Sequence, residues 1–354
     1  MRGLELSRRF YLEAVRPILE CRFPRLEHAA ALIGNGSEVL GFDDEVSADH
    51  HWGPRVQLFL RDLAPAADVH ETLADELPVE FGGYPTSFAP PDERGTRLLV
   101  AVERGPVAHR VETLDLRAYL RELIGVNPLE GFGVVDWLVT PSQRLLEVTA
   151  GEVFADPVGD LTRVRELLAW YPHDVWLVAM AGHWRQIAEL EHLCGRAASR
   201  GDELGSRVIA ASLVRELMRL GLLQERRYPP YPKWVGTAYA QLGRSEAHAL
   251  ERALSASAWP EREDALVEAY EAVARRHAEL AVTEPVEPTV RRFWNRPFRV
   301  LFADRFVDAL LAAVSDRKLA AAASAGTIDA VSSNVHVLTR PPLWRALANL
   351  YDRA

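Results

Sequence analysis

The residues best suited to chemistry lie in a glycine-rich stretch near the N-terminal end of the chain. Gly36 and Ser37 follow an apolar run, and eleven residues separate Ser37 from Asp49. A glycine lets the backbone approach a phosphate group closely, and a neighbouring hydroxyl and backbone amides can hydrogen-bond to its oxygens. A carboxylate such as Asp49 is a ligand for a divalent cation. The stretch therefore predicts a site for a phosphate-bearing ligand and a metal ion. The structural alternatives are a tight turn after a strand at Gly36 and Ser37, and a turn or helix-cap aspartate at Asp49.

His51 stands two residues after Asp49. Alternate residues of a strand point to the same side, so these two side chains can share one metal site. Three interpretations of His51 stay open. Its imidazole is a ligand of Mn²⁺ or Zn²⁺, which accept nitrogen better than Mg²⁺ does, or it is a general base that titrates near neutral pH. In the third interpretation the site has lost two-metal chemistry, because a neutral ring attracts a hard cation less than a carboxylate does.

Two predicted strands position this stretch. Residues 29–33 form an apolar run typical of a short buried strand, and residues 56–60 alternate at strand period. The carboxylates at 43–45 between them are expected to face solvent or to hold the loop by short-range hydrogen bonds, although one of them could assist a metal. Amphipathic helices are predicted over 4–21 and 64–77.

The remaining pattern divides the chain into two parts. Strands are predicted over residues 97–102 and 108–113, so helices and strands alternate in the first part. The second part is strongly helical, and proline-containing breaks separate most of its segments. The predicted helices there are 161–169, 174–199, 204–225, 245–256, 262–280 and 302–315. We therefore predict an α+β fold followed by an all-helical region.

Composition limits the class of protein. The 354 residues include 41 Lys and Arg against 50 Asp and Glu, so the formal net charge is −9. This charge disfavours non-specific binding to nucleic acid or an anionic membrane, but it leaves room for a local basic groove. Cys21 and Cys194 show no metal-ligand spacing, so a cytoplasmic location is expected. No signal peptide or membrane anchor is expected from residues 1–19, and no apolar run is long enough to span a membrane.

Several motifs carry resemblances to known families. The spacing of Gly36, Ser37 and Asp49 between two predicted strands resembles the signature of the nucleotidyltransferase superfamily. Four longer motifs resemble the DUF4037 family. They are Ser-Ala-Asp-His-His-Trp-Gly-Pro-Arg at 47–55, Trp-Tyr-Pro-x-Asp-Val-Trp at 170–176, Gly-Asp-Glu-Leu-Gly-Ser at 201–206 and Tyr-x-Pro-Tyr-x-Lys-Trp at 228–234.

This resemblance implies a plan similar to that of aminoglycoside nucleotidyltransferases. A nucleotidyltransferase-like mixed sheet with flanking helices is expected over residues 1–155, and a helical DUF4037-like domain over 156–354. The implied activity is transfer of a nucleoside monophosphate from an NTP, with ATP expected, to a hydroxyl acceptor. Mg²⁺ or Mn²⁺ is the implied metal. A small molecule is the expected acceptor ahead of RNA or protein, and a membrane is not an expected partner.

The resemblance also points to residues outside the first motif. The superfamily takes a third carboxylate from a later strand, which makes Glu112 the candidate metal ligand or general base; an exposed structural glutamate is the alternative. Tyr231 and Lys233 lie among prolines and aromatic residues, where they offer a stacking face and a cation for a nucleotide. A packed structural connection is the alternative for this segment.

Two departures from the family pattern weaken the catalytic interpretation. His51 replaces the usual second Asp, and residues 329–336 lack several carboxylates and an aromatic residue that the family tends to carry there. A non-catalytic nucleotide- or ligand-binding pseudoenzyme is therefore the alternative function. Elsewhere, Asp202 is expected to cap a helix, and His183 and Trp184 are expected to lie in the core.

Overall fold

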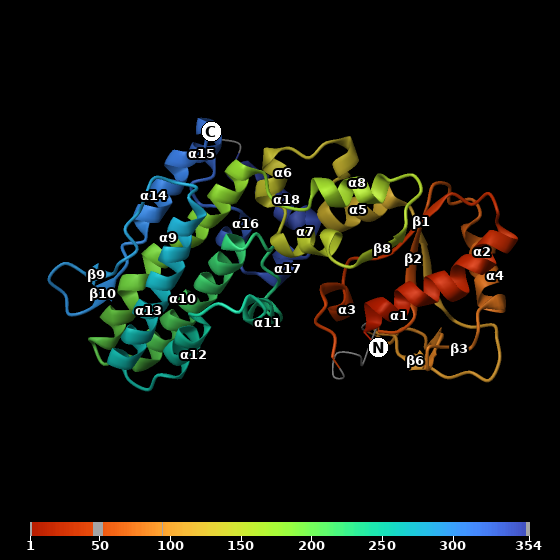
Figure 1. The fold of residues 1–354 in the computed structure, drawn as a ribbon, viewed down its shortest axis with the longest axis horizontal. Coiled ribbons are helices and arrows are strands. Elements are labelled where there is room, and N and C mark those ends of the chain that lie inside the picture. The colour runs from red at the N-terminus through yellow and green to blue at the C-terminus, as the bar shows by residue number, and fades with distance from the viewer. Residues whose placement is uncertain (1, 45–51, 94, 352–354) are drawn as a thin grey trace. The chain divides into compact units, whose positions relative to one another are not determined.

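The structure is a computed structural model that describes residues 2–44, 52–93 and 95–351 (Figure 1). Its contacts divide the chain into two compact units. The first comprises Met1–Phe132 and Arg144–Ala169, and the second comprises Gly133–Gln143 and Trp170–Ala354. The first unit is α+β and the second is dominated by helices, so the predicted fold class is confirmed. The domain boundary at 155/156 stays a prediction.

A four-stranded mixed sheet organises the first unit, in the order β7-β2-β1-β8. Its strands are β1 (His28–Leu32), β2 (Arg55–Leu60), β7 (Arg110–Leu114) and β8 (Glu152–Ala155). β1 is antiparallel to β2 and β8, whereas β2 and β7 are parallel. The glycine-punctuated stretch at 151–159, which contains the predicted domain boundary, thus supplies an edge strand of this sheet.

The two faces of the sheet follow the strand period. Val56, Leu58 and Leu60 pack on one face into a core that includes the N-terminal helical segments and α4. These elements are α1 (Gly3–Phe10), the π-helical turn η1 (Tyr11–Val15), α2 (Arg16–Arg22) and α4 (Ala66–Glu76). Phe59 packs on the opposite face near Leu161. That second face becomes polar toward the first residues of β2 and β7.

Shorter elements complete the first unit. The helices are α3 (Ser37–Leu40), α5 (Leu116–Ile124), η2 (Pro128–Glu130), α7 (Ser142–Thr149), which begins in the second unit, and α8 (Asp160–Leu167). Two-residue strands are β3 (Glu80–Phe81), β4 (Tyr84–Pro85), β5 (Ser87–Phe88) and β6 (Leu99–Val100). The strand predicted over 97–102 is therefore reduced to β6.

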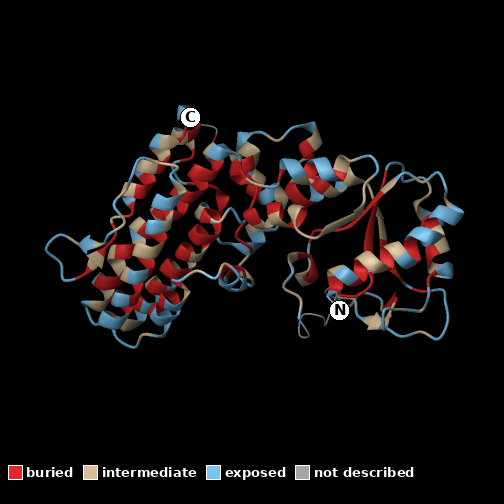
Figure 2. Cartoon of the chain, in the orientation of Figure 1, coloured by how far each residue is buried: buried red, intermediate tan, exposed pale blue. Residues whose placement is uncertain are grey.

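Long helices form the second unit, and Figure 2 shows buried residues along their inner sides. The main helices are α9 (His173–Ala198), α10 (Glu203–Gln224), α12 (Ala247–Ser255), α13 (Trp259–Leu280) and α14 (Asp304–Ala313). The smaller elements are α6 (Val134–Val139), α11 (Val235–Ala240), β9 (Arg291–Arg292), β10 (Arg299–Val300), α15 (Arg317–Ala322), α16 (Ile328–Val331), α17 (Val335–Leu338), α18 (Pro341–Arg345) and η3 (Ala346–Leu350). No helix among the described residues is both long and apolar enough to cross a membrane.

Two local predictions in the second unit are confirmed. His183 and Trp184 are 1% and 0% exposed and lie within α9. The carboxylate of Asp202 accepts a hydrogen bond from the amide of Gly205 at 2.8 Å, so it caps the first turn of α10.

Candidate functional site

The candidate site begins at the turn between β1 and α3, in the first unit. Gly34 and Gly36 have φ angles of +89° and +146°. A Cβ atom on Gly34 would lie 2.4 Å from the hydroxyl oxygen of Tyr119, and one on Gly36 would lie 2.6 Å from a carboxylate oxygen of Glu38. Both positions therefore require glycine. The backbone of the turn lies directly against the side chains of Tyr119 and Glu38. Ser37 follows as the first residue of α3.

Strand register brings further polar residues to the same face of the sheet. Gln57 of β2 is paired with Glu112 of β7, and parallel neighbours in register point to one side. Gln57 accepts a hydrogen bond from the amide of Ile33 at 2.9 Å and donates one to the hydroxyl of Tyr119 at 3.5 Å. Tyr119 in turn lies against Gly34. The face thus connects Glu112 with the glycine turn through described contacts.

Two buried ion pairs flank the turn. Arg55 pairs with Glu38, and these side chains are 11% and 4% exposed. Arg144 pairs with Glu147, and it also donates a hydrogen bond to the side-chain oxygen of Asn35 at 3.4 Å. Each glutamate offsets the charge of its arginine, which lowers the cost of burying either group. The result is a fixed set of guanidinium groups beside a glycine-lined backbone.

Tyr119 serves this site as a neutral hydroxyl. Burial raises the pKa of Tyr119 well above its ordinary value, and the negative charges of Glu147 and Glu112 act in the same direction. The hydroxyl therefore stays protonated and able to donate throughout the physiological pH range.

Glu112 is the one predicted metal ligand that the structure describes. Its side chain is 42% exposed, and it accepts a hydrogen bond from Nη2 of Arg110 at 2.6 Å. A partly exposed carboxylate is chemically suited to Mg²⁺ or Mn²⁺. Asp49 and His51 lie outside the described residues. Within the described ranges, no three His, Cys, Asp or Glu side chains gather in a metal-binding group.

Asp43 makes longer-range hydrogen bonds than the short-range ones expected for the acidic loop. Its carboxylate accepts a hydrogen bond from the amide of Gly3 at 2.7 Å and from the indole of Trp52 at 3.4 Å. It therefore links the start of α1 to the residues that lead into β2.

Several site residues were not predicted from the sequence. The polar Gln57 within the apolar strand β2 is a signal that could have been used, because an uncharged polar residue in a buried strand needs a partner. Glu38 and Arg55 gave no such signal, since their pairing depends on how α3 meets β2. Tyr119 and Arg144 reach the turn from elements that are far away in sequence.

Tyr231 and Lys233 lie in the second unit. The amide of Tyr231 donates a hydrogen bond to the side chain of Gln143 at 2.9 Å, and Lys233 lies 4.6 Å from the ring centre of Trp234. Tyr231 lines a cavity of about 30 Å³, and Lys233 does not. The predicted nucleotide contact of these two residues stays a prediction.

This cavity joins two segments that the sequence singled out separately. The proline-rich segment 229–232 lines one part, and Asp329 and Ser333 of the 329–336 segment line another. Asp329 accepts a hydrogen bond from the amide of Ser142 at 2.8 Å, and Arg219 donates to the backbone oxygen of Asp329 at 3.2 Å. Burial raises the pKa of Asp329. Asp329 is therefore buried in the second unit near the proline-rich segment, whereas residues 331–336 are mostly exposed.

Comparison with known proteins supports the family resemblance. Residues 137–235 match the family model described as "Domain of unknown function (DUF4037)", which confirms the resemblance and includes the motifs at 170–176, 201–206 and 228–234. No curated protein matches the chain. A solved structure of a nucleotidyltransferase-like protein from Exiguobacterium sibiricum 255-15 is similar with a TM-score of 0.35 and 14% identity. That similarity covers 78% of this chain and 77% of the other.

Proposed function

We propose that this protein binds an NTP, with ATP expected, and transfers its nucleoside monophosphate to a hydroxyl acceptor. One observation carries the proposal: the glycine turn that excludes side chains shares a sheet face with Glu112, through Gln57 and Tyr119. A site for phosphate and a carboxylate base are the two parts that such a transfer needs.

The described residues can take defined roles in this reaction. The backbone at Gly36 and the hydroxyl of Ser37 hydrogen-bond the triphosphate, and Arg55 stabilises its negative charge. Glu112 accepts the proton of the acceptor hydroxyl while the oxygen of that hydroxyl bonds to the α-phosphorus. The bond from that phosphorus to the bridging oxygen breaks, and pyrophosphate leaves.

A divalent cation would complete this site. Asp49 and His51 would hold Mg²⁺ or Mn²⁺ while Glu112 acts as the base, and the bound ion would offset negative charge on the phosphate oxygens. Tyr231 and Lys233 are proposed to contact the nucleotide, and a small molecule is the proposed acceptor.

Nucleotide binding without catalysis is the second candidate function. The ion pair between Arg110 and Glu112 favours it, because a guanidinium 2.6 Å from the carboxylate competes with both a metal and a proton. The histidine at position 51 favours it as well.

Titration calorimetry of the full chain with each NTP tests both candidates, with Mg²⁺, with Mn²⁺ and with EDTA. Metal-dependent binding of one NTP is expected, followed by pyrophosphate release when an acceptor is supplied. Binding that is indifferent to metal would instead support the pseudoenzyme, and no binding of any NTP would exclude both functions.

Glu112→Gln separates the two candidates further. This variant is expected to keep nucleotide binding and to lose pyrophosphate release by about 100-fold, the range for removal of a general base. Glu130→Gln is the matched control, because Glu130 also pairs with an arginine, Arg121, at 2.7 Å. Release that is unchanged in Glu112→Gln would contradict its role. In His51→Asp, faster pyrophosphate release than in the wild type would show that the site lacked a carboxylate. Slower release would show that His51 takes part in the reaction.

A further inference from the structure

A short hairpin extends from the helices of the second unit (Figure 1). It consists of β9 and β10, which pair antiparallel with Arg292 opposite Arg299. The connecting residues 293–298 form its tip, and the amide of Phe293 donates a hydrogen bond to the backbone oxygen of Phe298 at 2.9 Å. We call residues 291–300 the basic hairpin.

Aromatic and ionic contacts fix the basic hairpin on the bundle. The ring of Phe293 stacks on His192 of α9 with centres 5.2 Å apart, and on Phe298 with centres 5.5 Å apart. Phe298 is 3% exposed and packs against Gly195. Arg299 pairs with Glu263 of α13 at 3.0 Å. These contacts hold the hairpin in one position on the helices.

Trp294 lies at the tip of the hairpin with its ring edge-on to Phe302, and the ring centres are 6.3 Å apart. It is 76% exposed, and it has a φ angle of +54°, a conformation that is unfavourable for a bulky residue. Glycine or asparagine would suit this position better. Since Trp294 gives up both burial and a relaxed backbone, core packing does not account for a tryptophan here. Strained positions of this kind are often functional.

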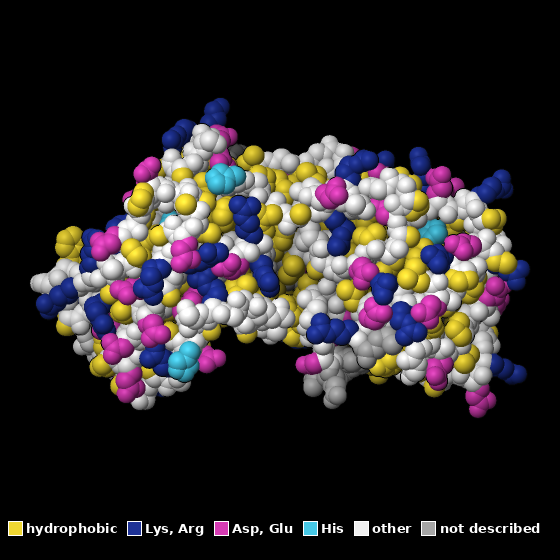
Figure 3. Space-filling view, viewed as in Figure 1, with side chains coloured by type: hydrophobic (Ala, Val, Ile, Leu, Met, Phe, Trp, Pro, Cys, Tyr) yellow, Lys and Arg dark blue, Asp and Glu magenta, His cyan; other side chains and the backbone are white. Residues whose placement is uncertain are grey.

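Two arginines beside Trp294 lack acidic partners among the residues that the structure describes. Arg292 donates from Nε to the backbone oxygen of Arg296 at 2.9 Å, and Arg296 forms no ion pair within those residues. By contrast, Arg291 pairs with Glu287 at 2.7 Å. Figure 3 shows Lys and Arg side chains at this end of the second unit. The tip is therefore locally basic on a chain whose net charge is −9.

We infer that the basic hairpin binds single-stranded nucleic acid. The indole of Trp294 stacks on one base, and the guanidinium groups of Arg292 and Arg296 contact neighbouring phosphates. Aromatic stacking and arginine contacts to the backbone are the two parts of this mode of binding, and stacking does not depend on sequence because every base offers a stacking face. An anionic membrane fits less well, since stable membrane binding requires a larger apolar area together with several basic residues. This inference does not rest on the proposed nucleotide site.

Fluorescence anisotropy of the full chain with a 5′-fluorescein-labelled 12-nucleotide oligouridine tests the inference. The wild-type protein is expected to bind the oligonucleotide, and added salt is expected to weaken the complex. Trp294→Gly is expected to lower the affinity about tenfold, a typical effect of losing one stacked base. Glycine tolerates the backbone at this position, so the melting temperature of the variant should equal or exceed that of the wild type.

Charge variants test the phosphate contacts separately. Arg292→Ala and Arg296→Ala are each expected to reduce the slope of log affinity against log salt by about 0.7, the value for one phosphate of a single strand. Arg317→Ala is the matched control, because Arg317 is exposed and also donates to a backbone oxygen, at 3.2 Å. It should leave the affinity and the slope unchanged.

No binding of the oligonucleotide by the wild type would overturn the inference, and so would any of three further outcomes. The first is wild-type affinity in Trp294→Gly. The second is displacement of the oligonucleotide by excess ATP equally from the wild type and from Trp294→Gly, which would place it at another site. The third is Trp294-dependent sedimentation with phosphatidylserine vesicles without oligonucleotide binding, which would make a membrane the partner.

Discussion

The hydroxyl of Tyr119 occupies space that a side chain on Gly34 would need. An added Cβ would lie 2.4 Å from that oxygen, at a φ of +89°. Gly41 is the matched control, because its φ is +73° but nothing lies within 4 Å of an added Cβ. Gly34→Ala is expected to lower the free energy of unfolding by about 1–3 kcal/mol more than Gly41→Ala does, as overpacking typically costs. Urea denaturation measures both, and equal losses would contradict the steric argument.

The buried ion pair between Arg55 and Glu38 leads to a second prediction about a single side chain. Arg55→Ala leaves Glu38, which is 4% exposed, as a buried charge without its cation. The expected loss in free energy of unfolding is about 3–5 kcal/mol. Arg61→Ala removes an exposed pair with Glu27 just after β2 and is expected to cost about 0–1 kcal/mol. Similar losses in the two variants would show that burial of Glu38 is not the cause.

The positions of individual residues were predicted correctly where they depend on neighbours in the sequence. Asp202 caps its own helix, and the periodicity of α9 places His183 and Trp184 in the core. Glu38 and Arg55 were not predicted, because their contact arises only when the strand and the short helix α3 are assembled.

Many of the longer elements were predicted from periodicity, and β8 is an instructive exception. Alternation or an apolar run indicated β1 and β2, and the 3.6-residue period indicated α9 and α10. β8 was not predicted. It has only four residues between glycine- and proline-containing segments, and its assignment depends on pairing with β1.

The strand β7 carries a prediction about acid stability through His109, just before it. The Nδ1 atom of His109 accepts a hydrogen bond from the amide of Val111, and Nε2 lies 3.1 Å from the backbone oxygen of His70. Both contacts suit a neutral ring. Burial lowers the pKa of His109 to about 4, below its ordinary value of 6.5. The unfolded chain therefore takes up this proton first, and the stabilising contribution present above pH 6.5 is lost as the pH falls toward 4.

The size of this effect is about 3 kcal/mol, from the difference between the two pKa values. Urea denaturation at pH 7.5 and 4.5 should show a smaller pH dependence in His109→Gln than in the wild type. His248→Gln is the control, since His248 is exposed. An identical pH dependence in all three proteins would mean that His109 does not titrate as proposed.

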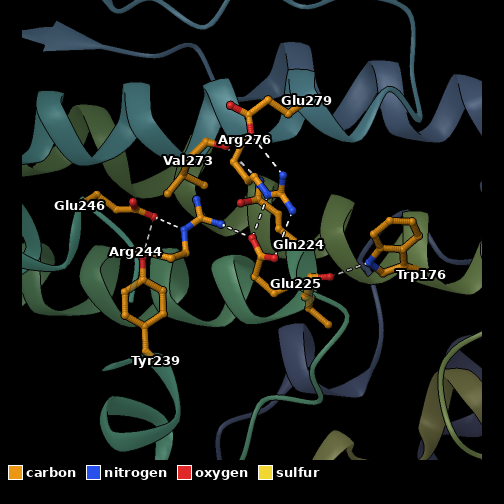
Figure 4. Close-up of polar contacts among 10 residues, drawn as sticks. Trp176, Gln224, Glu225, Tyr239, Arg244, Glu246, Val273, Arg276 and Glu279 are labelled. Carbon is orange, nitrogen blue, oxygen red and sulfur yellow. Dashed lines mark hydrogen bonds and ion pairs between the residues drawn. The ribbon is translucent and has the colours of Figure 1, made fainter. Parts of the chain in front are cut away.

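The C-terminal end of α10 is joined to neighbouring helices by a polar network (Figure 4). Arg244 donates to Glu246 at 2.5 Å and to Glu225 at 3.0 Å, and Glu246 is 2% exposed. Arg244→Ala leaves Glu246 buried with the hydroxyl of Tyr239 as a remaining partner. The expected loss in free energy of unfolding is about 3 kcal/mol.

Arg276→Ala is the comparison within the same network. Arg276 and its partner Glu225 are about one-third exposed, so the expected loss is about 0.5 kcal/mol. Thermal unfolding followed by circular dichroism distinguishes the two variants. A larger loss of stability in Arg276→Ala than in Arg244→Ala would mean that Arg276, and not Arg244, contributes most to this network.

The whole chain crosses between its two units more than once. Residues 133–143 belong to the second unit, and the chain then returns to the first until Ala169. Leu161 of α8 is fully buried in the core of the first unit, and Arg165 donates to the backbone oxygen of Ala150 at 2.6 Å. The compact units therefore assign α8 to the first unit, whereas the predicted division at 155/156 assigns it to the helical domain.

Two fragments test which division folds. Residues 1–169 include α8 and are expected to unfold cooperatively, whereas residues 1–155 lack the buried Leu161 and are expected to lose that cooperativity. Thermal unfolding by circular dichroism provides the comparison. Equal cooperativity in the two fragments would favour the boundary at 155/156.

Chain order also affects how this protein matures on the ribosome. The amide of Ser142 is paired in the final structure with the carboxylate of Asp329, which is 187 residues further along. At a synthesis rate of about 5–20 residues per second, Asp329 is synthesised about 10–40 s after Ser142. Residues 144–169, in contrast, can join the sheet and its core as soon as they emerge. The early segment at 133–143 is therefore among the last parts of the protein to reach its final contacts.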